Sequence, residues 1–342
     1  MIALFYLAVA TYVGHRLCKR MLPGLDGSRS DSTSRPVASW VISYPAAFLC
    51  GTLLVTWATY LTAWLFRDKR APLTYANAIV LGVVLFAIAA ERFRSKRGGF
   101  NAAEAKTTVE ESSPPRRWLD FVVVGTALTV GTALMLHTCR LEGDTLVLGR
   151  TAFGDLNIHL GMARSFSYGK NFPTGYVAYA GTDIRYHFMF YFLVGNLEYL
   201  GLPLDWAINL PSILSFASVL LLFHAIGSVA GRDARVGALA VLFFLLRSSP
   251  AIFFLFSAPE PAGFGGRISS VLKARRFIGL TGHEPWGIWN LNVYVVERHF
   301  AFAFGLVLLA VLYLIRTPRL DSGPSLFRRV NAGARIPVSS PN

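Results

Sequence analysis

Apolar runs alternate with polar segments along the whole chain, and several runs are long enough to cross a bilayer. A membrane-spanning helix needs about 20 mostly apolar residues. The runs that reach or approach this length cover residues 1–14, 38–66, 73–91, 118–138, 204–230, 236–257 and 299–315. This pattern predicts an all-α membrane protein with about seven transmembrane helices.

The first run, residues 1–14, resembles the apolar part of a secretory signal peptide. It lacks the basic start of such a peptide, and its positive charges (Arg16, Lys19 and Arg20) follow the apolar residues instead. Positive charges beside a span tend to stay in the cytoplasm. We therefore expect a retained anchor with its N-terminus outside the cytoplasm.

The composition agrees with a membrane protein. Hydrophobic residues make up 54% of the chain and charged residues only 15%, whereas soluble domains carry about 25% charged residues. The formal net charge of +14 does not indicate nucleic-acid binding, because the basic residues cluster between apolar runs, where they set the topology. Cys18, Cys50 and Cys139 are far apart, which argues against a disulfide framework or a cysteine metal site.

The distribution of lysine and arginine predicts the orientation. With the N-terminus outside, the cytoplasmic segments carry 19 Lys and Arg residues and the outer segments carry 12. The cytoplasmic segments are then residues 15–37, 92–117, 231–235 and 316–342, and the outer segments are residues 67–72, 139–203 and 258–297. Because basic residues are enriched on the cytoplasmic side, we expect this orientation in the plasma (inner) membrane.

The same pattern predicts four regions. They are an N-terminal membrane region (1–91) with three apolar segments, a cytoplasmic linker (92–117), a membrane core (118–315) and a disordered cytoplasmic tail (316–342). A further apolar stretch, residues 187–200, is too short to cross the bilayer. We expect it to be a short amphipathic helix of the outer loop that lies along the membrane interface.

Candidate chemistry gathers in the polar, aromatic-rich part of the first long outer loop. Asp155 and His159 are four residues apart at the expected start of a helix, so they share one face and can touch. A carboxylate beside an imidazole can accept a proton or hold a metal ion. Alternatively, Asp155 simply caps the helix by accepting hydrogen bonds from free backbone amides.

A second group, Arg185-Tyr186-His187, opens the short apolar stretch. Arg185 and His187 can pair with a lipid phosphate while Tyr186 stacks on a sugar or an isoprenoid. Alternatively, Tyr186 is one of the aromatic residues that membrane proteins place at the level of the lipid headgroups, and its polar neighbours anchor the chain there.

A third group, Glu297-Arg298-His299, stands at the outer mouth of the last apolar run. Ionisable residues that enter a membrane often mark a pathway or a binding site, so we count Glu297 and Arg298 among the candidate lipid-phosphate contacts. Alternatively, Glu297 and Arg298 form an ion pair whose side chains extend to the membrane–water interface. His224 lies on an otherwise apolar run, and we expect it to be a packing residue rather than a ligand.

In their order along the chain, these features resemble the polyprenyl-phosphate-sugar-dependent membrane glycosyltransferases of the GT-C type. The resemblance covers residues 153–315 and is carried by the order of short motifs rather than by any one of them. The motifs are Gly154-Asp155 with His159, Asn171-Phe172-Pro173, Tyr186-His187-Phe188, Gly201-Leu202-Pro203, Asn209-Leu210-Pro211-Ser212, the basic turn 232–235 and Ser248-Ser249-Pro250.

In that family an acid of the first outer loop is the catalytic base or a metal ligand, and by resemblance Asp155 takes its place. The family's donor is a sugar on a polyprenyl phosphate, and transfer takes place on the non-cytoplasmic face. The resemblance thus implies a glycosyltransferase with a lipid-linked donor, with a divalent cation as a candidate cofactor held by Asp155 and His159. Family members usually continue with several more spans, so we expect a truncated or degenerate relative, or one that acts with a partner.

A second class of function also fits the sequence. A polytopic membrane protein without catalytic activity could bind or scaffold a lipid-linked intermediate with the same outer residues. Transporters often have paired halves with broken helices, and the chain has no such repeat, so a lipid binder or scaffold is the better version of this alternative.

Overall fold

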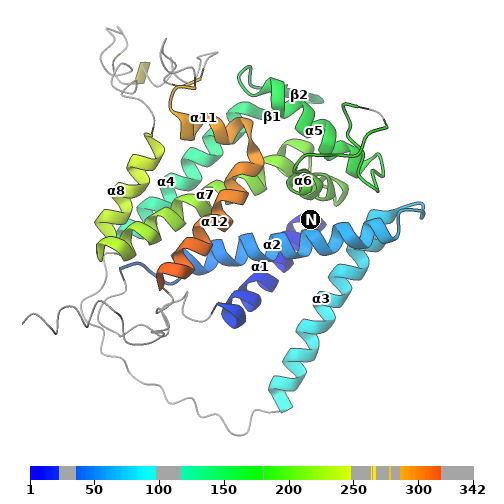
Figure 1. The fold of residues 1–342 in the computed structure, drawn as a ribbon, viewed down its shortest axis with the longest axis horizontal. Helices are drawn as coiled ribbons and strands as arrows, with labels where there is room; N and C mark the ends of the chain where they lie inside the picture. The colour runs from blue at the N-terminus through cyan, green and yellow to red at the C-terminus, as the bar shows by residue number, and fades with distance from the viewer. Residues whose placement is uncertain are drawn as a thin grey trace, which may run out of the picture.

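The computed structural model describes residues 1–22, 36–97, 117–179, 181–247, 263, 265–266, 277–278 and 286–316. Helices dominate this part of the chain (Figure 1). They are α1 (Ile2–Met21), α2 (Trp40–Leu65), α3 (Pro72–Arg97), α4 (Arg117–Thr138), α5 (Phe153–Ser167), α6 (Met189–Tyr199), α7 (Leu204–Gly231), α8 (Ala234–Leu245), α11 (Trp289–Val296) and α12 (Arg298–Arg316).

Five of these helices are long and apolar enough to cross a membrane, which confirms the helical, membrane-embedded character of the chain. They are Trp40–Leu65, Pro72–Phe93, Trp118–Thr138, Leu204–Gly231 and Arg298–Arg316. The described part of α8 has only 12 residues, and α1, with 20 residues, is not among the five. Seven spans therefore remain a prediction, and residues 248–257 of the sixth expected span lie outside the described residues.

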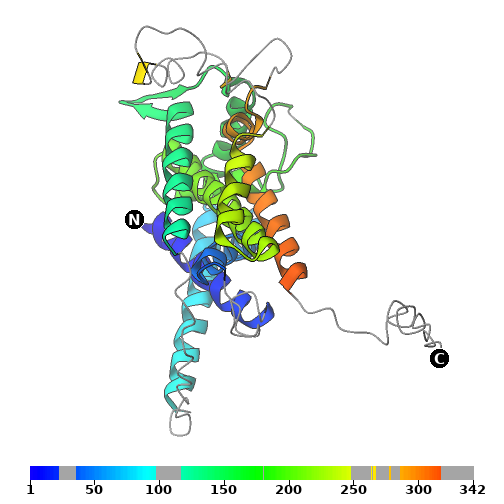
Figure 2. The same cartoon turned by 90° about the vertical axis from the view of Figure 1, so that its left-hand side faces the viewer.

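Helix α7 is the central helix of the bundle. It packs against α2, α4, α6, α8 and α12 (Figures 1 and 2). Three of its buried serines donate to carbonyl oxygens one turn earlier: Ser212 to Ile208 at 2.7 Å, Ser215 to Pro211 at 2.6 Å and Ser218 to Leu214 at 2.7 Å. These internal bonds satisfy the hydroxyl groups where water is excluded, so polar residues are tolerated in the middle of the bundle.

Small residues allow α1 and α2 to pack very closely. Ala10 and Gly14 on α1 face Ala47 and Gly51 on α2, each pair one turn apart. A Cβ atom added to Gly51 would lie 1.9 Å from the Ala10 carbonyl oxygen, and one added to Gly14 would lie 1.9 Å from that of Ala47. This is the small-xxx-small arrangement by which membrane helices bring their backbones together.

Helix α3 leaves the bundle after its first half (Figures 1 and 2). The side chains of Asn77 on α3 and Asn196 on α6 bond reciprocally, at 2.7 and 3.1 Å, and fasten the buried first half. Farther along, Val83 and Phe86 are exposed, as expected of a helix surrounded by lipid. α3 also continues to Arg97, so the first residues of the expected linker are helical.

The ends of α4, α7 and α12 meet on one side of the bundle. The Asp205 carboxylate at the start of α7 accepts from the Leu141 backbone N–H at 3.0 Å, just after α4. Arg298 at the start of α12 donates to Thr138 Oγ1, at the end of α4, at 2.8 Å. Because α4 ends where α7 and α12 begin, α4 runs antiparallel to both. The segment that follows α4 and the residues that precede α7 and α12 therefore lie at this end of the bundle.

The opposite end of the bundle holds a buried polar pair. Asp120 on α4 lies 2.8 Å from His224 Nε2 on α7, and its other oxygen accepts from the Ala38 backbone N–H at 2.9 Å. Both side chains are almost fully buried. The pair joins α4, α7 and the start of α2, in agreement with the expectation that His224 is a packing residue.

Two elements between α4 and α7 differ from the expected architecture: one is a pair of strands, and the other is a helix in an unexpected environment. Strands β1 (Cys139–Glu142) and β2 (Thr145–Leu148) form an antiparallel hairpin around Gly143-Asp144, a dipeptide suited to a tight turn. Helix α6 is buried from Phe190 to Glu198. It is therefore an internal helix, packed against α5, α7 and α2, and not the amphipathic interfacial helix that we expected.

Candidate functional site

Three segments that are distant in sequence bring their ionisable side chains together at the end of the bundle where α4 ends. His159 comes from α5, and His187 comes from the stretch just before α6. Glu297 and His299 come from the junction of α11 and α12. Glu297 ends α11 with a non-helical backbone, so the chain bends there and its side chain projects toward the histidines. We call these four residues, with Tyr186 and Tyr191, the histidine cluster.

His159 forms the buried side of the histidine cluster. Only 3% of its side chain is exposed, and its ring stacks on the Tyr191 ring with 4.3 Å between the ring centres. Its Nε2 lies 3.2 Å from the Tyr186 hydroxyl and 3.9 Å from Glu297 Oε2. His159 Nδ1 is buried and has no hydrogen-bond partner within the described residues. The ring is thus held between two tyrosines and directed toward Glu297.

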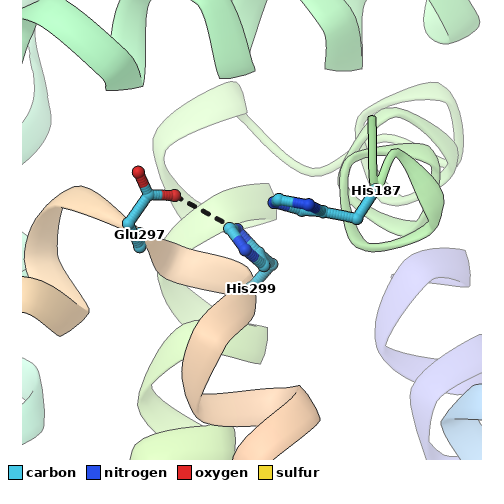
Figure 3. A group of neighbouring side chains, drawn as sticks. All are labelled: His187, Glu297 and His299. Carbon is cyan, nitrogen blue, oxygen red and sulfur yellow. Dashed lines mark ion pairs between the residues drawn. The ribbon is translucent and has the colours of Figure 1, made fainter. Parts of the chain in front are cut away.

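His187, Glu297 and His299 form the outer side of the cluster. Their side chains point toward one another (Figure 3), and one possible ligand atom from each lies within 4.8 Å of the others. His299 Nδ1 lies 3.5 Å from Glu297 Oε2 and 2.8 Å from the Tyr191 hydroxyl. These three residues are the group within the described part of the chain that could hold a metal ion.

Burial shifts the pKa values of the imidazoles and of the Glu297 carboxyl in opposite directions. Burial, with a smaller effect of His187, lowers the pKa of His159 to about 4. Burial also lowers the pKa of His187. For Glu297, burial raises the pKa, the Asp155 charge raises it further, and a hydrogen bond from Tyr186 opposes the rise. The lowered pKa values favour neutral imidazoles, and each neutral ring has a lone pair that can bind a cation.

Asp155 lies in the first turn of α5, as expected, but its side chain is exposed and does not cap the helix. No hydrogen bond or ion pair joins it to His159 among the described contacts, because the His159 ring turns inward to Tyr186 and Tyr191. Asp155 and His159 therefore do not form the expected metal pair. Asp155 remains near the cluster, since its charge raises the pKa of both Glu297 and Tyr186.

The residues before α6 divide between the cluster and the surface. Tyr186 bonds to His159, and the His187 ring lies against the His299 ring with 3.6 Å between centres. Arg185 is exposed, and within the described part of the chain it makes no hydrogen bond or ion pair. Tyr186 and His187 are thus parts of one site, and the exposed Arg185 next to them pairs with no described residue.

Arg298 differs most from its expected role. It is fully buried and points away from the cluster, toward the end of α4. Its guanidinium contacts Met135 Sδ and donates to the Met135 carbonyl at 3.3 Å and to Thr138 Oγ1 at 2.8 Å. It neither pairs with Glu297 nor reaches a surface where a lipid phosphate could bind. Its contacts instead hold the start of α12 against α4.

The Asn171-Phe172-Pro173 motif forms a structural turn beside the cluster. The Asn171 side chain accepts from the Gly175 backbone N–H at 2.7 Å and donates to the Gly175 carbonyl at 2.9 Å. Phe172 packs against Tyr60 of α2. The turn therefore ties the loop between α5 and α6 to the bundle.

His299 and Tyr191 belong to the site although neither was among the expected site residues. His299 could have been identified because it follows Glu297 and Arg298 at the mouth of an apolar run. Tyr191 lies four residues after His187, a spacing that would place both on one side of the helix expected over residues 187–200. An aromatic residue in an apolar stretch gives no sign of such a role by itself.

Comparison with known proteins yields no relative: no family model, no curated protein and no solved structure matches the chain.

Proposed function

We propose that the chain is a membrane glycosyltransferase that moves a sugar from a polyprenyl-phosphate carrier to an acceptor on the non-cytoplasmic face. One observation carries the proposal. Three segments singled out in the sequence, at Asp155 to His159, Arg185 to His187 and Glu297 to His299, lie together at one end of an apolar helical bundle. Such a position suits a donor whose prenyl chain is in lipid and whose sugar phosphate is in water.

Asp155 is the proposed catalytic base. In an inverting transfer the acceptor hydroxyl attacks the anomeric carbon, the bond from that carbon to the phosphate oxygen breaks, and the hydroxyl proton passes to a carboxylate. Asp155 suits this role because it is exposed at the first turn of α5, where an acceptor can reach it. Glu297, shielded among imidazoles, suits it less.

Arg185 and His187 are the proposed contacts of the departing polyprenyl phosphate. Negative charge on the phosphate grows as its bond to the sugar breaks, so nearby donors stabilise the transition state more than the ground state. Arg185 is exposed and pairs with none of the described residues, and His187 is an exposed member of the cluster. Arg298 has no direct part in this proposal because it is buried against α4.

The test uses full-length protein in liposomes with a radiolabelled sugar on a polyprenyl phosphate and a mixture of acceptor lipids. The proposal predicts release of polyprenyl phosphate that depends on both the protein and the acceptor. Binding of the donor without turnover, across donors that carry different sugars, would instead favour the non-catalytic lipid binder or scaffold. A protein that shows no donor binding and no turnover would exclude both the glycosyltransferase and the lipid binder.

A further inference from the structure

We infer that His187, Glu297 and His299 bind a divalent transition-metal cation of the zinc class. The inference does not depend on sugar transfer, because it rests on the geometry and chemistry of these three side chains alone. It also differs from a metal on Asp155 and His159, which the structure keeps apart.

The distances within the group suit a metal site. A tetrahedral cation with ligand bonds of about 2.0–2.1 Å sets its ligand atoms about 3.3 Å apart. The His299 Nδ1 and Glu297 Oε2 atoms already lie 3.5 Å apart, and all three ligand atoms lie within 4.8 Å of one another. Only a small movement of the exposed His187 side chain is needed to close the group around an ion (Figure 3).

An unsatisfied carboxylate oxygen also points to a cation. Glu297 Oε2 is shielded from solvent and has no hydrogen-bond partner within the described residues. Buried carboxylate oxygens normally accept hydrogen bonds or bind a positive charge, since leaving them unpaired is costly. The imidazole nitrogens of His299 and His159 lie 3.5 Å and 3.9 Å from this oxygen. A metal ion shared with His187 and His299 would supply the missing charge.

The ligand types decide the class of cation. Magnesium and calcium take oxygen ligands almost exclusively, whereas two imidazoles with one carboxylate suit zinc and its neighbours. Three protein ligands leave a fourth position open to water or to a substrate oxygen, the arrangement of catalytic rather than structural zinc sites.

The surrounding residues orient the ligands. The Tyr191 hydroxyl bonds to His299 Nδ1 at 2.8 Å and fixes the direction of that ring. Tyr191 is fully buried in α6, so its own position is fixed by packing. Because Nδ1 is also the nitrogen that lies 3.5 Å from Glu297 Oε2, a cation bound there takes the place of this hydrogen bond, and Tyr191 orients the His299 ring before the cation binds.

The test measures Co²⁺ binding to the full-length protein in detergent, with any polyhistidine tag removed. Co²⁺ is used because its visible absorption reports a tetrahedral site. We expect one Co²⁺ per chain, displaced by Zn²⁺ but not by excess Mg²⁺. His187→Ala and Glu297→Gln should each weaken binding by more than about tenfold, and His137→Ala, which removes an exposed histidine of α4, should leave it unchanged.

Two results would overturn the inference: wild-type protein that binds no stoichiometric Co²⁺, or variants that bind as tightly as wild type. His187→Ala decides the matter if Glu297→Gln fails to fold, since His187 is exposed and its removal leaves no buried gap. Metal binding without sugar transfer would retain this inference and reject the proposed enzyme, so the two can fail separately.

Discussion

Asp155→Asn is expected to slow sugar transfer by about 10²–10⁴-fold, the usual contribution of a positioned general base. Asparagine has nearly the same shape as aspartate but cannot accept the proton of the acceptor hydroxyl. The side chain is exposed and bonds to no described residue, so the fold should tolerate the change. Turnover of a polyprenyl-phosphate sugar is the measurement, with the melting temperature checked in parallel.

The matched control for this variant is Asp183→Asn. Asp183 is an exposed acid of the same loop, and it lies outside the histidine cluster. The Asp183→Asn variant should transfer sugar at the wild-type rate. It thereby separates the effect of Asp155 from a general loss of negative charge. If Asp155→Asn and Asp183→Asn both turn over like wild type, Asp155 is not the base.

Gly51→Leu is expected to destabilise the protein by about 3 kcal/mol or more, the upper range for overpacking a close interface. Even the Cβ atom of a new side chain would lie 1.9 Å from the Ala10 carbonyl oxygen, so α1 and α2 must separate. The contact that fails is between backbones, and no rotation of a side chain relieves it. Loss of monodisperse protein during a heating series in detergent measures the effect.

Gly125→Leu is the control for the helix interface. Gly125 lies on an exposed face of α4, and a Cβ atom placed there would meet nothing within 4 Å. This variant should be as stable as wild type or slightly more so, because a helical glycine is replaced by a better helix former. Equal stability of the two leucine variants would contradict the close packing of α1 against α2.

The long apolar helices could be predicted from the sequence because their signal is composition over about 20 residues, which does not depend on neighbours. The runs at 38–66, 73–91, 118–138, 204–230 and 299–315 correspond to helices of the described structure. The start of a helix close to Asp155 was also predicted from the local sequence, and α5 begins at Phe153.

Features that depend on contacts between distant segments could not be predicted in the same way. Residues 187–200 were assigned to an interface because they are short and apolar, but α5, α7 and α2 enclose them as an internal helix. Length and hydropathy do not distinguish these two environments. The β1–β2 hairpin was missed although Gly143-Asp144 between two short strands is a local turn signal.

The site residues show how local backbone geometry limits such predictions. Glu297 and Arg298 are adjacent, yet one side chain enters the cluster and the other is buried against α4, because the chain bends at the non-helical Glu297 between α11 and α12. Asp155 and His159 have the spacing for contact, but stacking on Tyr191 draws the imidazole inward. The spacing of these residues along the chain therefore did not predict which side chains they contact.

The side of the membrane on which the cluster lies is the central claim of the proposed function, and cysteine labelling tests it most directly. In a chain whose own three cysteines are replaced, Asn157→Cys places a thiol on the exposed face of α5, and Arg20→Cys places one near the expected cytoplasmic end of α1. A membrane-impermeant maleimide applied to intact cells should label residue 157 and spare residue 20. Labelling of residue 20 from outside, with residue 157 reached only from the cytoplasmic side of inverted vesicles, would contradict the account.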